Sequence, residues 1–410
     1  MLNYMLSNGL ISRHQHGFLS RRSTGTQLLD CLNDWTINID HRESLDVIYI
    51  DFAKAFDSVV HRKLIYKLSC YGIAGNLLAW IEDFLCNRFQ FVVIDGFRSS
   101  TEPVLSGVPQ GSVLGPILFI VFINDACDEI NSAVSCKLYA DDIKLYSIVD
   151  FNGESNDLKI ALDNLCCWAE IWQLKINIDK CNVLRIGNNN IFGNYEMNDI
   201  VVPRVDTVTD LGIVVCGNLC FSDHITSCIS KAYRRSFLIF KGFSCRNADL
   251  LLKAYTTYIR PLLEYNTYIW SPADVDSINK LENVQRRFTK RIPSLSNQCY
   301  KDRLSALGIT TLEYRRLRFD LIMMYRIVHN LVDLDRDDFV MISNNVTRNA
   351  LLKLFKPRSL TSLRANFLCV RCINAWNALP EATRAAANIN VFKRNLSMCN
   401  LSTFLKVFQF

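Results

Sequence analysis

Residues 136–146 read CKLYADDIKLY, two short apolar runs on either side of an Asp-Asp pair. Alternation of apolar and polar residues is typical of half-buried strands, so the segment predicts two strands joined near Asp141 and Asp142. An ordinary exposed turn is the alternative. However, two-residue hairpin turns favour Asn-Gly or Asp-Gly over Asp-Asp. Adjacent carboxylates beside apolar strands are costly unless a positive charge neutralises them. The pair therefore predicts a site for a divalent cation.

A third carboxylate follows the apolar run DVIYI at residues 46–50. This run predicts a buried strand that ends at Asp51, and a strand end holds a ligand on a rigid edge. The alternative is a helix cap. Asp57 and Ser58 are the better predicted caps, because the helical pattern begins after them. Asp51 is therefore predicted to join Asp141 and Asp142 around Mg²⁺ or Mn²⁺, since oxygen-only ligands favour these ions over zinc.

The loop SGVPQGS at residues 106–112 precedes the longest apolar run of the chain, residues 113–123. Its two glycines and its proline predict a tight loop with free backbone N–H groups before a helix, which can receive a phosphate or let a base approach. A plain turn is the alternative. The apolar run is shorter than the ~20 residues that span a bilayer. It therefore predicts a buried helix.

In this order, the three segments resemble motifs A, B and C of reverse transcriptases: DFAKAFD (51–57), SGVPQGSVLGPILF (106–119) and YADD (139–142). Motif B and the YADD box are similar to those of non-LTR (LINE-like) retrotransposons, and less closely to those of group II intron enzymes. Further resemblances are to the fingers motif before A (15–24), motif D (174–184), motif E (205–215) and the thumb (251–270). Several spaced motifs in order are far more specific than any single match. The resemblance covers residues 4–330.

The resemblance implies a role for each acidic residue. Asp51 and Asp141 would bind two metal ions, Asp142 would assist, and the backbone carbonyl of Phe52 would complete the shell of one metal. Two ions about 4 Å apart suit in-line displacement at phosphorus, one at the attacking hydroxyl and the other at the leaving pyrophosphate.

The resemblance also implies contacts with the nucleotide. Phe56 would exclude a ribose 2′-OH, or it is a core aromatic. Gln110 would lie near the incoming nucleotide, and Arg22 would reach the triphosphate or the template. Lys180 would protonate the pyrophosphate leaving group, or it is a solvated surface lysine. Within motif D, Cys181 stands where Thr or Ser is more usual.

The implied fold is α+β: a right-hand polymerase palm with partial fingers, then a mostly α-helical thumb and C-terminal region. We predict partial fingers and palm over residues 1–218, a helical thumb-like domain over 219–343 and a basic C-terminal segment over 344–410. Softer evidence for the last boundary is the polar, Asn-rich stretch 343–349. Helical spacing of apolar residues predicts helices in both parts. They cover residues 61–68, 76–85, 158–171, 224–240, 249–258, 275–292 and 311–330.

Charge is distributed unevenly along the 410 residues, whose formal net charge is +6. Residues 228–291 hold 12 Lys/Arg against 5 Asp/Glu, and residues 347–394 hold 9 against 1. A basic second half fits a protein that binds phosphate there and metal cations elsewhere. Solvated helical faces are the alternative. The expected partners are an RNA template, a DNA primer and dNTPs, and no membrane.

The 16 cysteines and the N-terminus bear on the compartment. The first residues lack the basic start and the long apolar run of a signal peptide. We therefore expect an intracellular protein, nuclear and cytoplasmic, whose cysteines are reduced and mostly buried thiols. The one CxxC pair, Cys369 and Cys372, lacks a second pair nearby, so a zinc site is not predicted.

The predicted activity is RNA-directed DNA synthesis for retrotransposition: nucleotidyl transfer from a dNTP to a primer 3′-OH. Met1 precedes Gln15 by only 14 residues, whereas related enzymes carry more fingers sequence there. No segment resembles an endonuclease or an RNase H. We therefore expect a truncated reading frame with a weakened nucleotide clamp, which costs positioning in phosphoryl transfer. The alternatives are a catalytically impaired remnant or co-opted RNA-binding protein with the same fold, and a metal-dependent nuclease.

Overall fold

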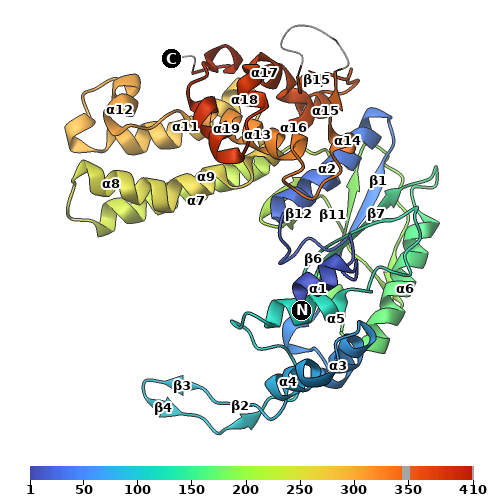
Figure 1. Cartoon of the computed structure of the whole chain (residues 1–410). Coiled ribbons are helices and arrows are strands. Elements are labelled where there is room, and N and C mark those ends of the chain that lie inside the picture. The colour runs from blue at the N-terminus through green and yellow to red at the C-terminus, as the bar shows by residue number, and fades with distance from the viewer. Residues whose placement is uncertain (344–350, 409–410) are drawn as a thin grey trace. The chain divides into compact units, whose positions relative to one another are not determined.

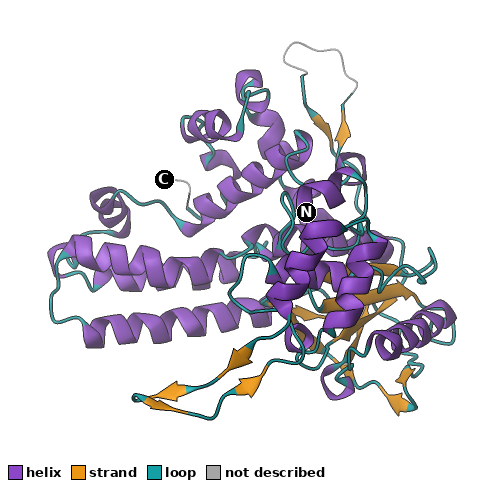
Figure 2. Cartoon of the chain, turned by 60° about the horizontal axis from the view of Figure 1, so that its bottom comes forward, coloured by secondary structure: helices purple, strands orange, loops and turns teal. Residues whose placement is uncertain are grey.

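The chain divides into two compact units in a computed structural model that describes residues 1–343 and 351–408 (Figure 1). The first unit comprises residues 1–27 and 42–208, and the second comprises residues 28–41 and 209–410. The predicted α+β class is confirmed, with strands concentrated in the first unit and helices in the second (Figure 2). The three-domain division at residues 218 and 343 stays a prediction. Residues 344–349 of the predicted polar break lie outside the described residues.

The first unit follows the order expected from its apolar patterns. Its elements are α1 (Leu2–Ser7), the start of α2 (Thr24–Asp40), β1 (Leu45–Ile50), η1 (Ala55–Asp57), α3 (His61–Cys70), α4 (Gly75–Leu85), β2 (Phe89–Gln90), β3 (Val93–Ile94), β4 (Phe97–Arg98), β5 (Glu102–Pro103), α5 (Gly115–Ile123), β6 (Ser135–Tyr139), β7 (Asp142–Ile148), α6 (Asn156–Trp172), η2 (Ile178–Lys180), β8 (Asn182–Ile186), β9 (Glu196–Met197), β10 (Ile200–Val201) and β11 (Arg204–Val205). The predicted strand at 46–50, the strand pair at 136–146 and the three predicted helices are confirmed to within a few residues, which is the usual uncertainty at element ends.

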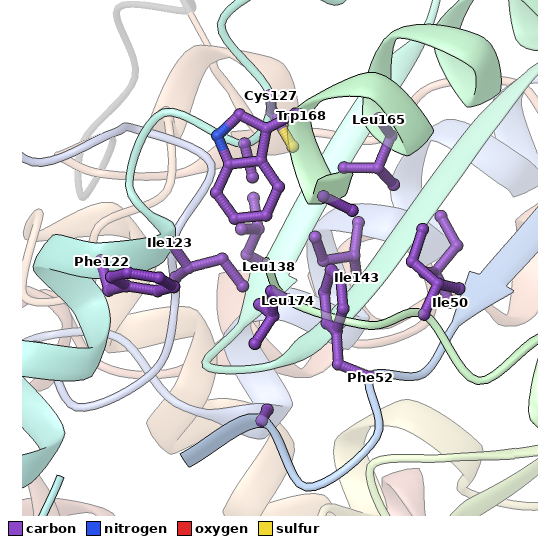
Figure 3. Packing of buried hydrophobic residues seen from close by; sticks show 14 of the residues in the cluster. Ile50, Phe52, Phe122, Ile123, Cys127, Leu138, Ile143, Leu165, Trp168 and Leu174 are labelled. Carbon is purple, nitrogen blue, oxygen red and sulfur yellow. The ribbon is translucent and has the colours of Figure 1, made fainter. Parts of the chain in front are cut away.

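A five-stranded sheet in the order β11-β8-β1-β7-β6 forms the centre of this unit. Strand β1 is antiparallel to both neighbours, and Ile50 faces Ile143 of β7. Apolar residues of one sheet face pack against α5 and α6, and Phe122 of α5 and Trp168 of α6 belong to the same buried cluster (Figure 3). Strand β1 has a neighbour on each side and five of its six residues are buried, so apart from Asp46 both of its faces carry mostly apolar side chains and its sequence does not alternate.

Helix α5 is apolar on every side and is buried accordingly. Each residue from Leu118 to Ile123 has no exposed surface. Pro116 occupies the first turn, where its missing N–H is not needed. The predicted buried helix is confirmed. None of the helices in the described ranges is long and apolar enough to cross a membrane.

Two cysteines depart from the expectation of reduced thiols. Cys127 and Cys136 form a disulfide, with their Cα atoms 6.6 Å apart. Both belong to the buried core, where the chain after α5 returns along β6 and brings the two side chains together. The expectation that the thiols are mostly buried is also wrong, because only six of the fourteen free cysteines are buried. Sequence context showed apolar neighbours but not which side chains meet.

A buried carboxylate ties β1 to the distal edge of the sheet. Asp46 has no exposed surface and accepts two hydrogen bonds each from Arg185 and Arg204, at 2.7–3.1 Å. Burial alone would raise the pKa of Asp46, but these hydrogen bonds and the two positive charges outweigh it and hold the pKa below its ordinary value. The ionised form is therefore the one that stabilises the fold.

We expect Asp46→Asn to lower the free energy of unfolding by about 3 kcal/mol or more, because it leaves two guanidinium groups without their counterion. Urea unfolding at pH 7 measures this. Glu154→Gln, which loses a partly exposed pair with Lys159, is the control and should cost less than about 1 kcal/mol. Equal effects of the two substitutions would contradict the assigned role of Asp46.

The second unit is mostly helical. Its elements are the rest of α2, β12 (Thr207–Asp210), β13 (Ile213–Cys216), α7 (Ser222–Gly242), α8 (Ala248–Ala254), the π-helix η3 (Tyr255–Ile259), α9 (Arg260–Glu264), α10 (Thr267–Trp270), α11 (Val275–Lys290), η4 (Pro293–Leu295), α12 (Tyr300–Leu307), α13 (Leu312–Val328), α14 (Arg336–Phe339), β14 (Met341–Ile342), β15 (Leu354–Phe355), α15 (Ser362–Asn366), α16 (Leu368–Arg371), α17 (Ile373–Ala378), α18 (Glu381–Arg384), α19 (Ile389–Ser397) and η5 (Ser402–Phe404). The helices predicted at 224–240, 275–292 and 311–330 are confirmed. The one predicted at 249–258 passes into η3, just before Pro261, which cannot continue an α-helical hydrogen-bond ladder.

Candidate active site

The strand end at Asp51 is fixed by its backbone. The carbonyl of Asp51 accepts the Asn177 N–H at 2.8 Å, and the Ala53 N–H donates to the Lys175 carbonyl at 2.8 Å. Phe52 thus lies opposite Ile176 in an isolated antiparallel bridge, and neither bond uses the Phe52 carbonyl. Motif D therefore holds the first residues of motif A in place. The carbonyl of Phe52, which is the predicted metal ligand, takes no part in this pairing.

The predicted helix caps after Asp51 are wrong. Helix α3 begins at His61, and its N-cap, Val60, makes no side-chain cap hydrogen bond. The Ser58 hydroxyl instead donates back to the carbonyls of Ala53 and Lys54, while Asp57 ends the short helix η1. A tight turn inserted between strand and helix separates these residues from the helix start, and periodicity alone does not reveal such a turn.

The YADD turn connects β6 and β7 and presents Asp141. Tyr139 faces Asp142 across the strand pair, so Ala140 and Asp141 form the turn itself. Ala140 has a φ of +57°, in the left-handed region that side chains other than glycine seldom occupy. Its N–H donates to the side-chain oxygen of Gln15 at 2.9 Å. Sequence analysis placed Gln15 in the fingers motif but did not predict this contact, because the two residues are 125 positions apart in the chain.

Two of the three predicted metal ligands influence each other electrostatically. Burial, and then the negative charge of Asp51, raise the pKa of Asp141. The Oδ2 atom of Asp51 is shielded from solvent and has no hydrogen-bond partner. The Lys180 ammonium lies 3.5 Å from this atom and is exposed. A buried carboxylate oxygen without a hydrogen bond, beside a second carboxylate, fits a cation site in charge and in ligand type.

Asp142 is placed differently from the other two. It is the first residue of β7 and its side chain is exposed. Among the described residues, no group of three or more His, Cys, Asp or Glu side chains is arranged to hold a metal ion. The structure therefore brings Asp51 and Asp141 together as a pair. The role of Asp142, like the metal itself, stays a prediction.

The motif B loop docks onto motif A. The Gly107 N–H donates to the Val59 carbonyl at 2.8 Å, and the Val108 N–H donates to the Phe56 carbonyl at 2.9 Å. Gly107 has a φ of +90°, and a Cβ there would lie 2.8 Å from the Cα of Asp57, so only glycine permits this approach. The expectation of free N–H groups is therefore wrong for these two residues, whose N–H groups join the two motifs.

The predicted nucleotide contacts have defined surroundings. Phe56 is half-buried and stacks on Phe119, with ring centroids 4.1 Å apart. The exposed Gln110 donates from Nε2 to the Asp57 carboxylate at 2.9 Å. Arg22 donates to the carbonyls of Arg13 and Gln15, so one of its nitrogens supports the backbone next to the YADD turn. Their contacts with a nucleotide stay predictions.

The site thus consists of a carboxylate pair at neighbouring strand ends with a glycine loop docked beside it. The segments that form it lie within the region that matches a known protein family. The profile of the family described as reverse transcriptase (RNA-dependent DNA polymerase) matches residues 1–215. The chain belongs to the reverse transcriptase family. This match covers about half of the chain and includes motifs A to E.

Similar proteins place this reverse transcriptase among those of mobile elements. It is 30% identical to the RNA-directed DNA polymerase from mobile element jockey of Drosophila melanogaster, over 69% of this chain and 32% of that protein. A type-1 retrotransposable element R2 polyprotein of Popillia japonica is 23% identical, over 34% of this chain and 24% of that protein. The chain spans about a third of the length of the curated relatives it matches over most of its own length. The predicted resemblance to LINE-like enzymes is confirmed.

One solved structure, apo telomerase from Candida tropicalis, is similar with a TM-score of 0.45 at 10% identity. The similarity covers 96% of this reverse transcriptase and 60% of that chain.

We expect Asp141→Asn to stabilise the metal-free protein at pH 7 by up to about 1 kcal/mol, a gain often found when functional strain is removed. A raised pKa means that ionised Asp141 weakens the fold, so this penalty appears as the pH rises above the ordinary value of 3.8. The gain should therefore shrink toward zero near pH 4. Urea unfolding in EDTA at both pH values measures it.

The exposed Asp83 on α4 provides the control, since Asp83→Asn should change little at either pH. Loss of stability in Asp141→Asn at pH 7 would show that the carboxylate is a structural acceptor and not a repelled member of a pair.

Proposed function

We propose that this chain is an RNA-directed DNA polymerase of a non-LTR retrotransposon, which transfers a nucleotide from a dNTP to a primer 3′-OH. The observation that carries the proposal is the Asp51–Asp141 pair: burial and the charge of Asp51 raise the pKa of Asp141, and the buried Oδ2 atom of Asp51 has no hydrogen-bond partner. Family membership supplies the reaction class, and the site supplies acidic groups of the kind that the reaction uses.

In this proposal the first unit contains the palm and part of the fingers. The five-stranded sheet with α5 and α6 is the palm, and residues 15–24 are fingers sequence. Helices α7 to α13 of the second unit form the thumb. The support is the position of the motifs: A follows β1 and includes η1, C joins β6 to β7, D includes η2, and the thumb-like sequence lies on α8 to α10.

The carboxylates of Asp51 and Asp141, with the Phe52 carbonyl, would hold Mg²⁺ or Mn²⁺, and Asp142 would assist. Bound there, divalent ions supply Lewis acidity at the attacking hydroxyl and at the leaving pyrophosphate. The protein's own contribution is placement. The Asn177 bond to the Asp51 carbonyl and the Gln15 bond to Ala140 keep the two carboxylates together before substrate arrives, which lowers the cost of reorganisation during the reaction.

Other residues would act on the nucleotide. Lys180, within ion-pair distance of Asp51, would donate a proton to the leaving pyrophosphate. Phe56, fixed against Phe119, would present a rigid edge where a ribose 2′-OH would fall. Gln110, oriented by Asp57, would pack near the incoming base or sugar, and Arg22 would contact the triphosphate or the template.

Basic side chains on α7 and α11 would contact the RNA template and DNA primer. These two helices pack against each other, and both expose positive charge. The exposed cations are Lys231, Arg234, Arg235 and Lys241 on α7, and Lys280, Arg287 and Lys290 on α11, with Arg291 just beyond its end; Lys280 is paired with Asp276. Contacts with phosphate from such rows are independent of sequence and weaken with added salt.

Primer extension on poly(rA) with oligo(dT), dTTP and Mg²⁺ tests the proposal. We expect Asp141→Ala and Asp51→Ala to reduce extension by at least about 100-fold, the loss typical when a preorganised electrostatic group is removed. Asp83→Ala is the matched acidic control and should retain wild-type extension. Fluorescence anisotropy of a labelled template–primer should show unchanged binding for all three variants.

Wild-type protein that binds template–primer without extending it would contradict the polymerase and favour the co-opted RNA-binding protein. Nicking of the substrate without incorporation would favour the nuclease.

We expect Phe56→Ala to raise the ratio of ribonucleotide to deoxyribonucleotide incorporation by about 10-fold or more, because a side chain no longer occupies the place of the 2′-OH. Single-nucleotide extension with dTTP and UTP measures the ratio. Phe119→Leu, which alters the stacking partner but leaves Phe56 in place, should change the ratio far less. If both variants changed the incorporation ratio equally, Phe56 would be a core residue and not a residue that excludes the 2′-OH.

A further inference from the structure

We propose that Gln15 is a positioning residue for Asp141: its side-chain amide holds the YADD turn in the conformation that directs the Asp141 carboxylate toward Asp51. This inference rests on the proposed function and adds a residue to it that touches neither metal nor nucleotide. It joins the segment preceding motif A to motif C.

Residues 14–16 run alongside β6 as an additional, parallel pairing. The His16 N–H donates to the Leu138 carbonyl at 2.7 Å, and the Leu138 N–H donates to the His14 carbonyl at 2.9 Å. Gln15 is thus opposite Leu138 in a parallel bridge. This pairing places the Gln15 side chain at the end of β6, where the turn begins.

The Gln15 amide then binds the turn on both sides. Its Oε1 accepts the Ala140 N–H at 2.9 Å and the Gly17 N–H at 2.7 Å. Its Nε2 donates to the Ala140 carbonyl at 3.4 Å. The side chain has no exposed surface, so water cannot replace these bonds. One amide therefore fixes both backbone groups of the residue that precedes Asp141.

The close approach depends on Gly17 as well. A Cβ at Gly17 would lie 2.6 Å from the Ala140 nitrogen and 3.3 Å from its Cα. Real Cβ atoms do not approach backbone so closely, so any larger residue would push the turn away. Within the QHG sequence, the two residues that do not ionise, Gln15 and Gly17, are the ones that contact Ala140 of the turn.

The turn needs such support for two physical reasons. Ala140 has a φ of +57°, and a residue other than glycine in this region costs on the order of 1 kcal/mol or more. The turn also carries Asp141, whose charge is repelled by Asp51. Both effects favour relaxation of the turn away from the site. A neutral amide opposes this relaxation without adding charge, which a carboxylate at the same place would do.

Binding of Mn²⁺ to the full chain, followed by electron paramagnetic resonance, tests the inference without relying on activity. We expect Gln15→Leu to weaken Mn²⁺ binding by about 10-fold or more and to lower kcat of primer extension with little change in KM for dTTP, since the loss is in alignment of the carboxylates. Gly17→Ala should act in the same way, because it displaces the same turn.

The chain offers a matched control in Gln27. It is also fully buried, and its amide has no hydrogen-bond partner among the described residues. Gln27→Leu makes the same change of side chain without removing a bond to the turn, so it should leave Mn²⁺ affinity unchanged. Thermal unfolding of all variants separates loss of metal binding from loss of the fold.

Rescue provides the sharpest outcome. Ala140→Gly makes the left-handed conformation accessible without support, so Gln15→Leu with Ala140→Gly should recover part of the lost Mn²⁺ affinity. The inference about Gln15 would be overturned if Gln15→Leu bound Mn²⁺ with wild-type affinity, or if Gln27→Leu lost as much affinity. Primer extension by the wild-type protein would still support the proposed polymerase activity in that case. If the wild-type protein bound Mn²⁺ in a way that depended on Gln15 but did not extend the primer, only the proposed polymerase activity would be overturned.

Discussion

The register between β1 and β7 is the constraint on which the site depends. Ile50 faces Ile143, so the chain leaves β1 at Asp51 beside the turn that carries Asp141. A shift of one residue would reverse the faces of the strand, turn Ile48 and Ile50 away from the core that they share with α5 and α6, and change which residue of β1 lies beside the turn. Burial of those side chains against α5 and α6 therefore enforces the register, and the apolar core and the acidic site are specified together.

Like charges at one edge of a sheet oppose folding, and the surrounding contacts show how the chain accommodates them. Backbone bonds from motif D fix Asp51, the Gln15 amide fixes the YADD turn, and the motif B loop closes over the end of motif A through Gly107. Each support is a neutral hydrogen bond or a close backbone approach. None removes the negative charge, so the site keeps its attraction for cations while its geometry is held from several directions.

A different balance holds at the other end of β1. Asp46 is as buried as any residue of the sheet, yet two arginines compensate its charge and the pKa falls. For Asp141, burial and the negative charge of Asp51 raise the pKa instead. Aspartate thus stabilises the fold at position 46, where two arginines pair with its charge, and carries a raised pKa at position 141, where another carboxylate lies nearby, as is common at functional sites.

The sequence by itself determined the elements and the family. Apolar runs and helical spacing located β1, α5, α6 and the long helices of the second unit, and ordered motifs named the family, because these features depend on residues close together in the chain. Tertiary structure decided the rest: that Gln15 contacts Ala140, that Cys127 meets Cys136, that Asp57 binds Gln110 and does not cap α3, and that Asp142 is exposed at the start of β7. Each of these depends on which distant segments lie side by side and on the direction of single side chains. Local pattern contains neither kind of information, since the same residues could satisfy their hydrogen bonds with water until burial removes that option.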